Sequence, residues 1–215
     1  MNKTDTTKTE KPAGQLSYLA LGDSYTIGEA VAQNQSFPYQ LSVKLNTQGI
    51  KAADPRIIAK TGWTTGELQG AIQSAAITSK FDIVTLLIGV NNQYRSNSIA
   101  IYRTEFKALL QTAIGFAGGN KAHVFVVSIP DWGLTPFGKG SGRDVNSIST
   151  AIDAFNAVNK EETISAGVSY TDITPGSRKV DTDVSLAASD GLHPSGKMYQ
   201  DWVSLLAPAI VKAFQ

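Results

Sequence analysis

One serine, one histidine and one aspartate stand where nucleophilic catalysis would need them. Ser24 follows Gly22-Asp23 at the end of a short apolar run, and Asp190 precedes His193 by three positions. A serine hydroxyl is a weak nucleophile until a base takes its proton, and a histidine oriented by a carboxylate is such a base. The sequence therefore offers the three groups of a hydrolytic serine enzyme, if the fold brings them together.

The two histidines of the chain also have structural interpretations. His193 precedes Pro194, and a histidine just before a helix also serves as a capping residue. The chain has only two histidines. The other, His123, follows Lys121 at the entrance of an expected strand, and we interpret it as structural or solvated.

Three expected strands end in a glycine followed by a polar side chain. The pairs are Gly22 with Ser24, Gly62 with Thr64, and Gly89 with Asn91. One such glycine simply marks where the chain turns. In a parallel sheet, however, the carboxyl ends of the strands share one edge, where α/β proteins bind their ligands. The three pairs together therefore predict a site at that edge.

The apolar pattern predicts the elements that position these groups. Five short apolar or β-branched runs read as strands, near residues 16–21, 56–59, 81–88, 124–129 and 168–173. Helices are expected from Ser36-Phe37-Pro38 to near Gly49, after Thr64 or Thr65, before Gly118-Gly119, over 144–166, and from Pro194 to the C-terminus. Residues 130–142 and the stretch to Ser189 are expected as loops. Regular alternation with long crossovers predicts an α/β fold: a three-layer α/β/α sandwich around a central, mainly parallel five-stranded sheet.

Composition limits the function classes. The chain has 215 residues, 42% of them hydrophobic, with a net charge of +1. This balance gives no electrostatic case for nucleic acid or an anionic membrane surface. With no cysteine, disulfides, thiolate metal sites and cysteine nucleophiles are excluded. Two distant histidines predict no metal site, no run is apolar enough for stable membrane insertion, and the oligomeric state stays open.

The N-terminus differs from the rest of the chain. Residues 1–14 are polar and rich in Thr and Lys, which predicts a disordered tail before one domain over 15–215. The tail is either a plain ragged terminus or the tether of an exported protein whose signal was removed. The compartment, cytoplasmic or periplasmic or secreted, therefore stays open.

Four short blocks in this order resemble those of the GDSL-type, or SGNH, hydrolases: Gly22-Asp23-Ser24, Gly62, Gly89-x-Asn91 and Asp190-x-x-His193. The resemblance runs from about Leu16 to the C-terminus and implies a flavodoxin-like SGNH fold without a cofactor. It implies that Ser24 is the nucleophile, His193 the base and Asp190 its orienting carboxylate. It also implies an oxyanion hole made of the backbone N–H groups of Ser24 and Gly62 and the side-chain amide of Asn91.

Two positions depart from the family pattern. Tyr25 stands where leucine is expected, and Asn92 stands where aspartate usually follows the asparagine. The second change weakens a supporting contact and leaves the proposed donor, Asn91, in place.

The resulting expectation is a serine esterase that cleaves carboxylic esters through an acyl-enzyme. Short acyl esters, lysophospholipids, acyl thioesters and O-acetylated carbohydrates all remain candidate substrates. Trp63 either walls the acyl pocket or belongs to the core, and Trp132 and Phe137 are expected to face substrate. The alternatives are a non-catalytic acyl- or carbohydrate-binding module of the same fold, and a flavodoxin-like cofactor binder. The latter leaves the Asp190–His193 pair unexplained.

Overall fold

The computed structural model describes residues 14–215, which contain a sheet of five strands, all parallel. The strands are β1 (Tyr18–Gly22), β2 (Arg56–Ala59), β3 (Ile83–Leu87), β4 (Val124–Val127) and β5 (Ser169–Thr171), in the spatial order β2-β1-β3-β4-β5. The α/β sandwich is confirmed, and the sheet is entirely rather than mainly parallel. The predicted tail lies outside the described residues, apart from Gly14.

The middle of the sheet explains why its strands read as unbroken apolar runs. All residues of β1, β3 and β4 are buried, since helices cover both faces of the sheet. Gly22 at the end of β1 pairs in register with Ala59 of β2 and Leu87 of β3. The segments that follow these three strands therefore leave the sheet side by side at one edge.

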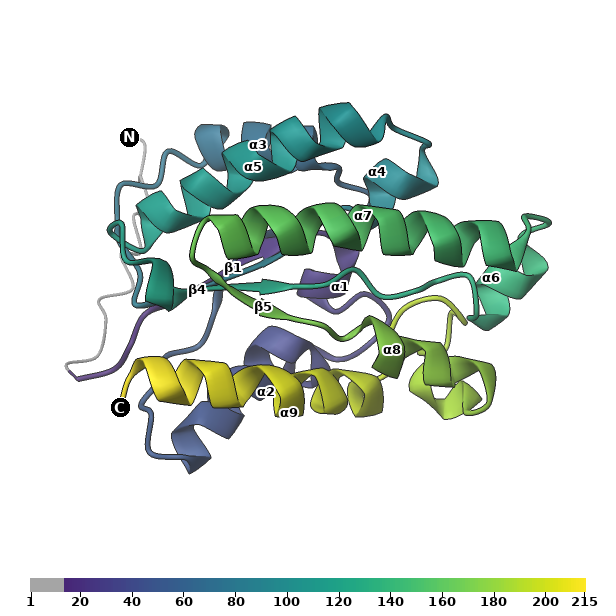
Figure 1. Cartoon of the computed structure of the whole chain (residues 1–215). Helices are drawn as coiled ribbons and strands as arrows, with labels where there is room; N and C mark the ends of the chain where they lie inside the picture. The colour runs from purple at the N-terminus through teal and green to yellow at the C-terminus, as the bar shows by residue number, and fades with distance from the viewer. Residues whose placement is uncertain (1–13) are drawn as a thin grey trace, which may run out of the picture.

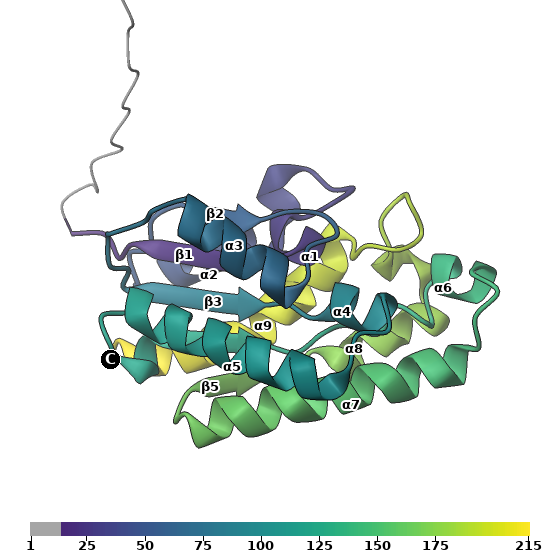
Figure 2. The ribbon, with the colours of Figure 1, turned by 90° about the horizontal axis from the view of Figure 1, so that it is seen from above.

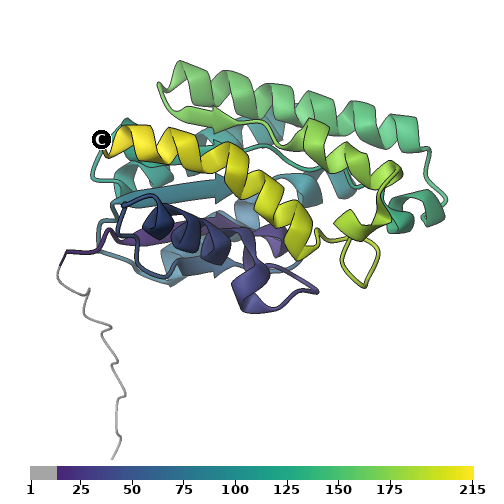
Figure 3. The same ribbon diagram turned by 90° about the horizontal axis from the view of Figure 1, so that it is seen from below.

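Two layers of helices enclose the sheet (Figures 1 and 2). One face carries α3 (Thr65–Ser74), α5 (Ile99–Phe116) and α7 (Val145–Ser165), and the other carries α2 (Phe37–Thr47) and α9 (Gly196–Ala213), which pack together as Figure 3 shows. Their buried faces join the strands in one hydrophobic core. None of the helices in residues 14–215 is both long and apolar enough to span a bilayer.

Short helical turns cluster at the carboxyl edge of the sheet, opposite the end where the chain terminates (Figure 1). They are α1 (Ser24–Ile27), α4 (Val90–Tyr94), α6 (Pro136–Gly140) and α8 (Thr174–Ser177). Single 3-10 turns lie at η1 (Gln33–Gln35), η2 (Lys121–His123), η3 (Arg178–Asp181) and η4 (Val184–Leu186). Of the predicted site residues, Ser24, Asn91 and Phe137 lie in these turns, and the others lie in the connecting loops.

Several details of the sequence interpretation need correction. The loops expected over 130–142 and up to Ser189 contain α6, α8, η3 and η4, and α4 was not predicted at all. Ser36 does not cap α2 with its side chain; its hydroxyl donates to the Gln33 carbonyl instead. The last helix begins at Gly196, capped by Ser195, and not at Pro194. Turns this short carry too little periodicity to be read from the sequence.

Candidate active site

Ser24 is the first residue of α1, directly after β1. Asp23 caps this helix, and its side chain accepts the Tyr25 N–H at 3.0 Å. As a first-turn residue, Ser24 has no intrahelical acceptor for its N–H, and within residues 14–215 no other acceptor takes it. The serine is 5% exposed, so both its side chain and this N–H are largely shielded at the carboxyl edge of the sheet.

Asp23 is fully buried beside this serine. One carboxyl oxygen, Oδ2, has no hydrogen-bond partner in the described part of the chain. Burial raises the pKa of Asp23 to about 7, although the Tyr25 N–H opposes that change. The carboxyl therefore titrates near neutral pH instead of staying ionised.

His193 and Asp190 form the expected pair. The Nδ1 atom of His193 lies 2.5 Å from Oδ2 of Asp190. The other carboxylate oxygen accepts the backbone N–H groups of Leu192 and His193, at 2.9 and 3.0 Å. Burial acts to raise the pKa of Asp190, but the His193 ring and these N–H groups outweigh it and hold that pKa below its usual value. The carboxylate thus stays charged and orients the ring, leaving Nε2 for a second partner.

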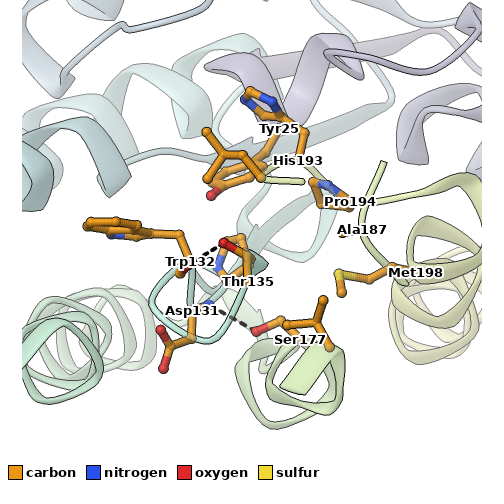
Figure 4. A pocket seen from close by; sticks show the side chains of 12 residues that line it. Tyr25, Asp131, Trp132, Thr135, Ser177, Ala187, His193, Pro194 and Met198 are labelled. Carbon is orange, nitrogen blue, oxygen red and sulfur yellow. Dashed lines mark hydrogen bonds between the residues drawn. The ribbon is translucent and has the colours of Figure 1, made fainter. Parts of the chain in front are cut away.

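The base lies next to the strand end that carries the serine. The ring of Tyr25 packs edge-on against His193, with the centroids 5.7 Å apart (Figure 4). The hydroxyl of Ser24 makes no hydrogen bond to His193 among the described residues. The structure therefore forms the Asp190–His193 pair and brings it to the helix that begins with Ser24.

Gly62 lies in a tight turn over Lys60–Trp63, in which the Trp63 N–H donates to the Lys60 carbonyl at 3.2 Å. As the third residue of the turn, Gly62 has φ +85°, which a type II turn requires and glycine supplies. An added Cβ would meet only Arg95, at 3.7 Å, so backbone conformation and not crowding within the protein demands glycine. Across the described residues the Gly62 N–H has no acceptor.

Asn91 lies on α4, which follows β3. Its side-chain amide donates to the Trp63 carbonyl at 3.0 Å, and that contact leaves its second N–H free. The next residue, Asn92, accepts the Thr65 N–H at 3.0 Å and donates to the Thr65 hydroxyl at 2.7 Å. Asn91 and Gly62 are thus brought together by direct contacts between their two segments.

The three residues predicted to face substrate differ in their exposure. Trp63 is half-buried against the core. Trp132 is 2% exposed, and its indole N–H donates to Gln93 at 2.8 Å. Phe137 is 41% exposed and packs against Trp132, with the ring centroids 6.2 Å apart. Of the three, Phe137 presents the most surface, and Trp132 supports it from beneath.

A small cavity separates Trp132 from His193 (Figure 4). It measures about 10 Å³, which is room for about one water molecule. Tyr25, Asp131 and Met198 are among the residues that line it. The side of His193 that faces Trp132 is therefore nearly closed.

Helix α6 is hydrogen-bonded to the loop that carries His193. The Phe137 N–H donates to the Gly191 carbonyl at 2.9 Å, between Asp190 and His193. The strand end before α6 is anchored by Asp131, which is buried and pairs with Arg178 at 2.9 Å. The 130–142 segment therefore supports the base as well as lining its surroundings.

Some residues near the site escaped the sequence interpretation. Arg95 donates from Nη2 to the Gly62 carbonyl at 2.6 Å, and Tyr94 is 41% exposed beside Trp132. Arg95 stands four positions after Asn91, which is one helical turn, so recognising α4 would have placed both on one face. Within residues 14–215, no three acidic or histidine side chains form a cluster that could hold a metal ion.

Comparison with solved structures supports the same fold. A lipase/acylhydrolase from Enterococcus faecalis is 20% identical over 91% of this chain and 95% of its own, with a TM-score of 0.67. A putative GDSL-like lipase from Parabacteroides merdae is 15% identical, covers 93% of this chain and 99% of its own, and has a TM-score of 0.70. The psychrotrophic esterase EstA from Pseudoalteromonas is 15% identical over 93% of this chain and 97% of its own, with a TM-score of 0.64.

A search of curated protein sequences found no match. The model of the GDSL-like lipase/acylhydrolase family matches residues 20–200, a range that includes every named residue of the four blocks. The family match favours a carboxylic ester hydrolase over the alternative of a flavodoxin-like cofactor binder. This chain belongs to the GDSL-like lipase/acylhydrolase, or SGNH, family.

Proposed function

We propose that this chain hydrolyses carboxylic esters through an acyl-enzyme on Ser24. The Ser24 hydroxyl attacks the ester carbonyl while Nε2 of His193 accepts its proton. The tetrahedral intermediate then expels the alcohol, which takes that proton from His193. Water repeats the sequence on the acyl-enzyme, releasing the acid and restoring the serine.

The observation that carries this proposal is the contact of 2.5 Å between Nδ1 of His193 and Oδ2 of Asp190. A carboxylate in this position fixes the tautomer with its proton on Nδ1, so Nε2 can act as the base. The neighbouring ring contact with Tyr25 supports a short path from Nε2 to Ser24.

Three hydrogen-bond donors without an acceptor support an oxyanion hole. The N–H groups of Ser24 and Gly62 have no acceptor among residues 14–215, and Asn91 has a second amide hydrogen left after its bond to Trp63. Backbone donors without partners are uncommon in folded proteins. Donors fixed where negative charge develops are worth roughly 3 kcal/mol each in the transition state.

For the substrate, we propose esters of short acyl groups. The nearly closed cavity beside His193 offers no space for a long chain on that side. On the open side, the exposed rings of Tyr94 and Phe137 provide an aromatic surface on which a short acyl group can lie. Lysophospholipids, acyl thioesters and O-acetylated carbohydrates are then distinguished by an ester panel that varies acyl length and leaving group.

Serine and histidine substitutions test the mechanism. Ser24→Ala and His193→Ala are each expected to lose nearly all turnover of 4-nitrophenyl acetate. Matched controls are Ser74→Ala, at an exposed serine of α3, and His123→Ala, at the other histidine. Wild-type turnover in either Ser24→Ala or His193→Ala would contradict the proposed mechanism.

A fluorophosphonate probe separates an enzyme from a non-catalytic binding module. An activated serine forms a covalent adduct with the probe, whereas a binding module does not. We expect labelling at Ser24 that is lost on heating and in His193→Ala. Absent labelling of the folded wild-type protein would favour the binding module.

Substitution of the surface residue Phe137 tests acyl preference directly. Phe137→Ala is expected to change the ratio of kcat/KM values between acetate and hexanoate esters, since the side chain is largely exposed. Val184→Ala, at another exposed apolar residue, serves as the control. An unchanged ratio would remove Phe137 from the acyl site.

A further inference from the structure

The Gly62 turn is held by a residue from another segment. The carbonyl oxygen of Gly62 accepts a hydrogen bond of 2.6 Å from Nη2 of Arg95. A charge-assisted bond of this length is stronger than a bond between neutral groups. The N–H and the carbonyl of Gly62 lie in the two peptide planes that meet at its Cα, so holding the carbonyl restricts where the N–H can point.

Arg95 and Asn91 belong to the same helical turn. Arg95 caps the C-terminus of α4, and its backbone N–H donates to the Asn91 carbonyl at 3.0 Å. Asn91 itself donates to the Trp63 carbonyl at 3.0 Å. Two consecutive carbonyls of the turn, at Gly62 and Trp63, thus accept hydrogen bonds from side chains at α4.

The other end of the guanidinium is anchored independently. Nη1 of Arg95 contacts both carboxylate oxygens of Glu67, at 3.2 and 3.3 Å. Glu67 is held in turn by the capping box of α3, where it accepts the Thr64 N–H at 2.8 Å. That N–H is the first cause of the lowered pKa of Glu67, so the carboxylate stays charged. Arg95 therefore bridges a fixed helix start and the Gly62 carbonyl.

We propose that Arg95 is a positioning residue that sets the Gly62 N–H relative to the Asn91 amide, and so shapes the oxyanion hole. This rests on the proposed function, because it takes both groups as donors to the transition state. Water can satisfy the Gly62 carbonyl once Arg95 is removed, but water cannot fix the distance between the turn and α4. Arg95 acts through Gly62 and is not assigned any contact with substrate.

The Arg95–Glu67 ion pair contributes little to the stability of the fold. The side chains of Arg95 and Glu67 are 48% and 45% exposed, and exposed ion pairs are worth about 1 kcal/mol or less. Removing Arg95 is therefore expected to leave the protein folded while the turn loses its fixed position. This separates a positioning effect from a loss of folded protein.

The test compares Arg95→Met and Arg95→Lys with a control, Arg103→Met. Arg103 also bridges two carboxylates, those of Glu161 and Glu162, but it does so between α5 and α7. Each variant is assayed in the full chain with 4-nitrophenyl acetate for kcat and KM. Binding of methylboronic acid, which forms a tetrahedral adduct on a serine, reports the oxyanion hole directly.

We expect Arg95→Met to lower kcat about 10- to 100-fold, somewhat less than the loss of a whole oxyanion donor. KM should stay within about twofold, and methylboronic acid affinity should fall in parallel with kcat. Arg95→Lys should recover part of both, because an ammonium can still donate to the Gly62 carbonyl. Arg103→Met should change neither.

The outcomes separate the two proposals. Loss of turnover in Ser24→Ala with wild-type kcat in Arg95→Met would overturn the Arg95 proposal alone. A rise of KM without a change in kcat would also overturn it, since that result indicates direct substrate contact. Full turnover in Ser24→Ala would overturn both.

Discussion

The carboxylate of Asp190 holds His193 at two points: Oδ2 contacts the ring Nδ1 at 2.5 Å, and Oδ1 accepts the backbone N–H at 3.0 Å. One side chain therefore fixes both the main chain and the tautomer of the base. Because the two residues are only three positions apart, this arrangement is local and needs little support from distant segments.

Asp190→Asn should separate orientation from folding. The amide keeps a similar shape but removes the charge that favours a proton on Nδ1 and stabilises the imidazolium. We expect kcat for 4-nitrophenyl acetate to fall about 10³- to 10⁴-fold with little change in KM. Asp183→Asn, at an exposed aspartate that pairs with Lys197 at 2.6 Å, is the control. A tenfold loss or less would argue against Asp190 as the orienting carboxylate.

Asp23 is expected to make stability depend on pH. Its folded-state pKa of about 7 exceeds the ordinary 3.8, so between these values the folded state binds more protons than the unfolded state. Stability therefore falls as pH rises from about 4 to 7, by on the order of 4 kcal/mol at most, and is unaffected by this group below that range.

Asp23→Asn removes this ionisation while keeping a side chain that can cap α1. Urea unfolding across pH 4 to 8 should show its stability relative to wild type increasing with pH and levelling off above pH 7. Asp23→Ala removes the same ionisation and also loses the bond to the Tyr25 N–H, so its stability should follow the same pH dependence and lie about 1 kcal/mol below that of Asp23→Asn at every pH. A constant difference between Asp23→Asn and wild type would refute the raised pKa.

The backbone at Gly62 supplies a test of conformation. Gly62→Ala forces a Cβ into the left-handed region at φ +85°, which costs roughly 1–2 kcal/mol or displaces the turn. We expect a lower kcat together with reduced stability. Gly70→Ala in α3, where an added Cβ has nothing within 4 Å, should instead stabilise the protein by about 0.5–1 kcal/mol at full activity. Equal effects of the two substitutions would contradict this account.

Asn92 can be returned to the family's usual aspartate. The Thr65 hydroxyl now donates to Glu105 and accepts from Asn92. In Asn92→Asp, two carboxylates compete for one hydroxyl proton, so we expect a loss of about 1–3 kcal/mol at neutral pH. Adding Glu105→Gln should restore much of it, because Gln can donate to the same hydroxyl. Thermal unfolding of the double-mutant cycle measures the coupling, and purely additive effects would count against this network.

The sequence allowed the sheet, the long helices and the chemical blocks to be predicted for simple reasons. The strands β1 and β3 are buried on both faces and so are almost entirely apolar, and Thr64, one of the two residues expected to begin the next helix, caps α3. The Asp190–His193 contact spans three positions and depends on local geometry. Patterns like these can be recognised in the sequence because their physical cause is local or periodic.

Other features depend on contacts between distant segments. The sequence predicts that Trp132 faces substrate, yet its indole is buried and bonded to Gln93, 39 positions away. Arg95 acquires its partner, Gly62, only when β1, β2 and β3 lie in register. A one-turn helix such as α4 has no periodic signature, so these contacts could not be predicted from the sequence.

The hydrogen bond from the Phe137 N–H to the Gly191 carbonyl has a consequence for engineering. On the proposed mechanism, the segment that carries Phe137 shares a bond with the loop that carries the general base, His193. Insertions or deletions within 130–142 would therefore shift His193 along with the acyl surface. Substitutions of exposed side chains on α6 leave that backbone bond in place. On the proposal that Phe137 contacts the acyl group, libraries confined to these side chains should change selectivity and keep more active members.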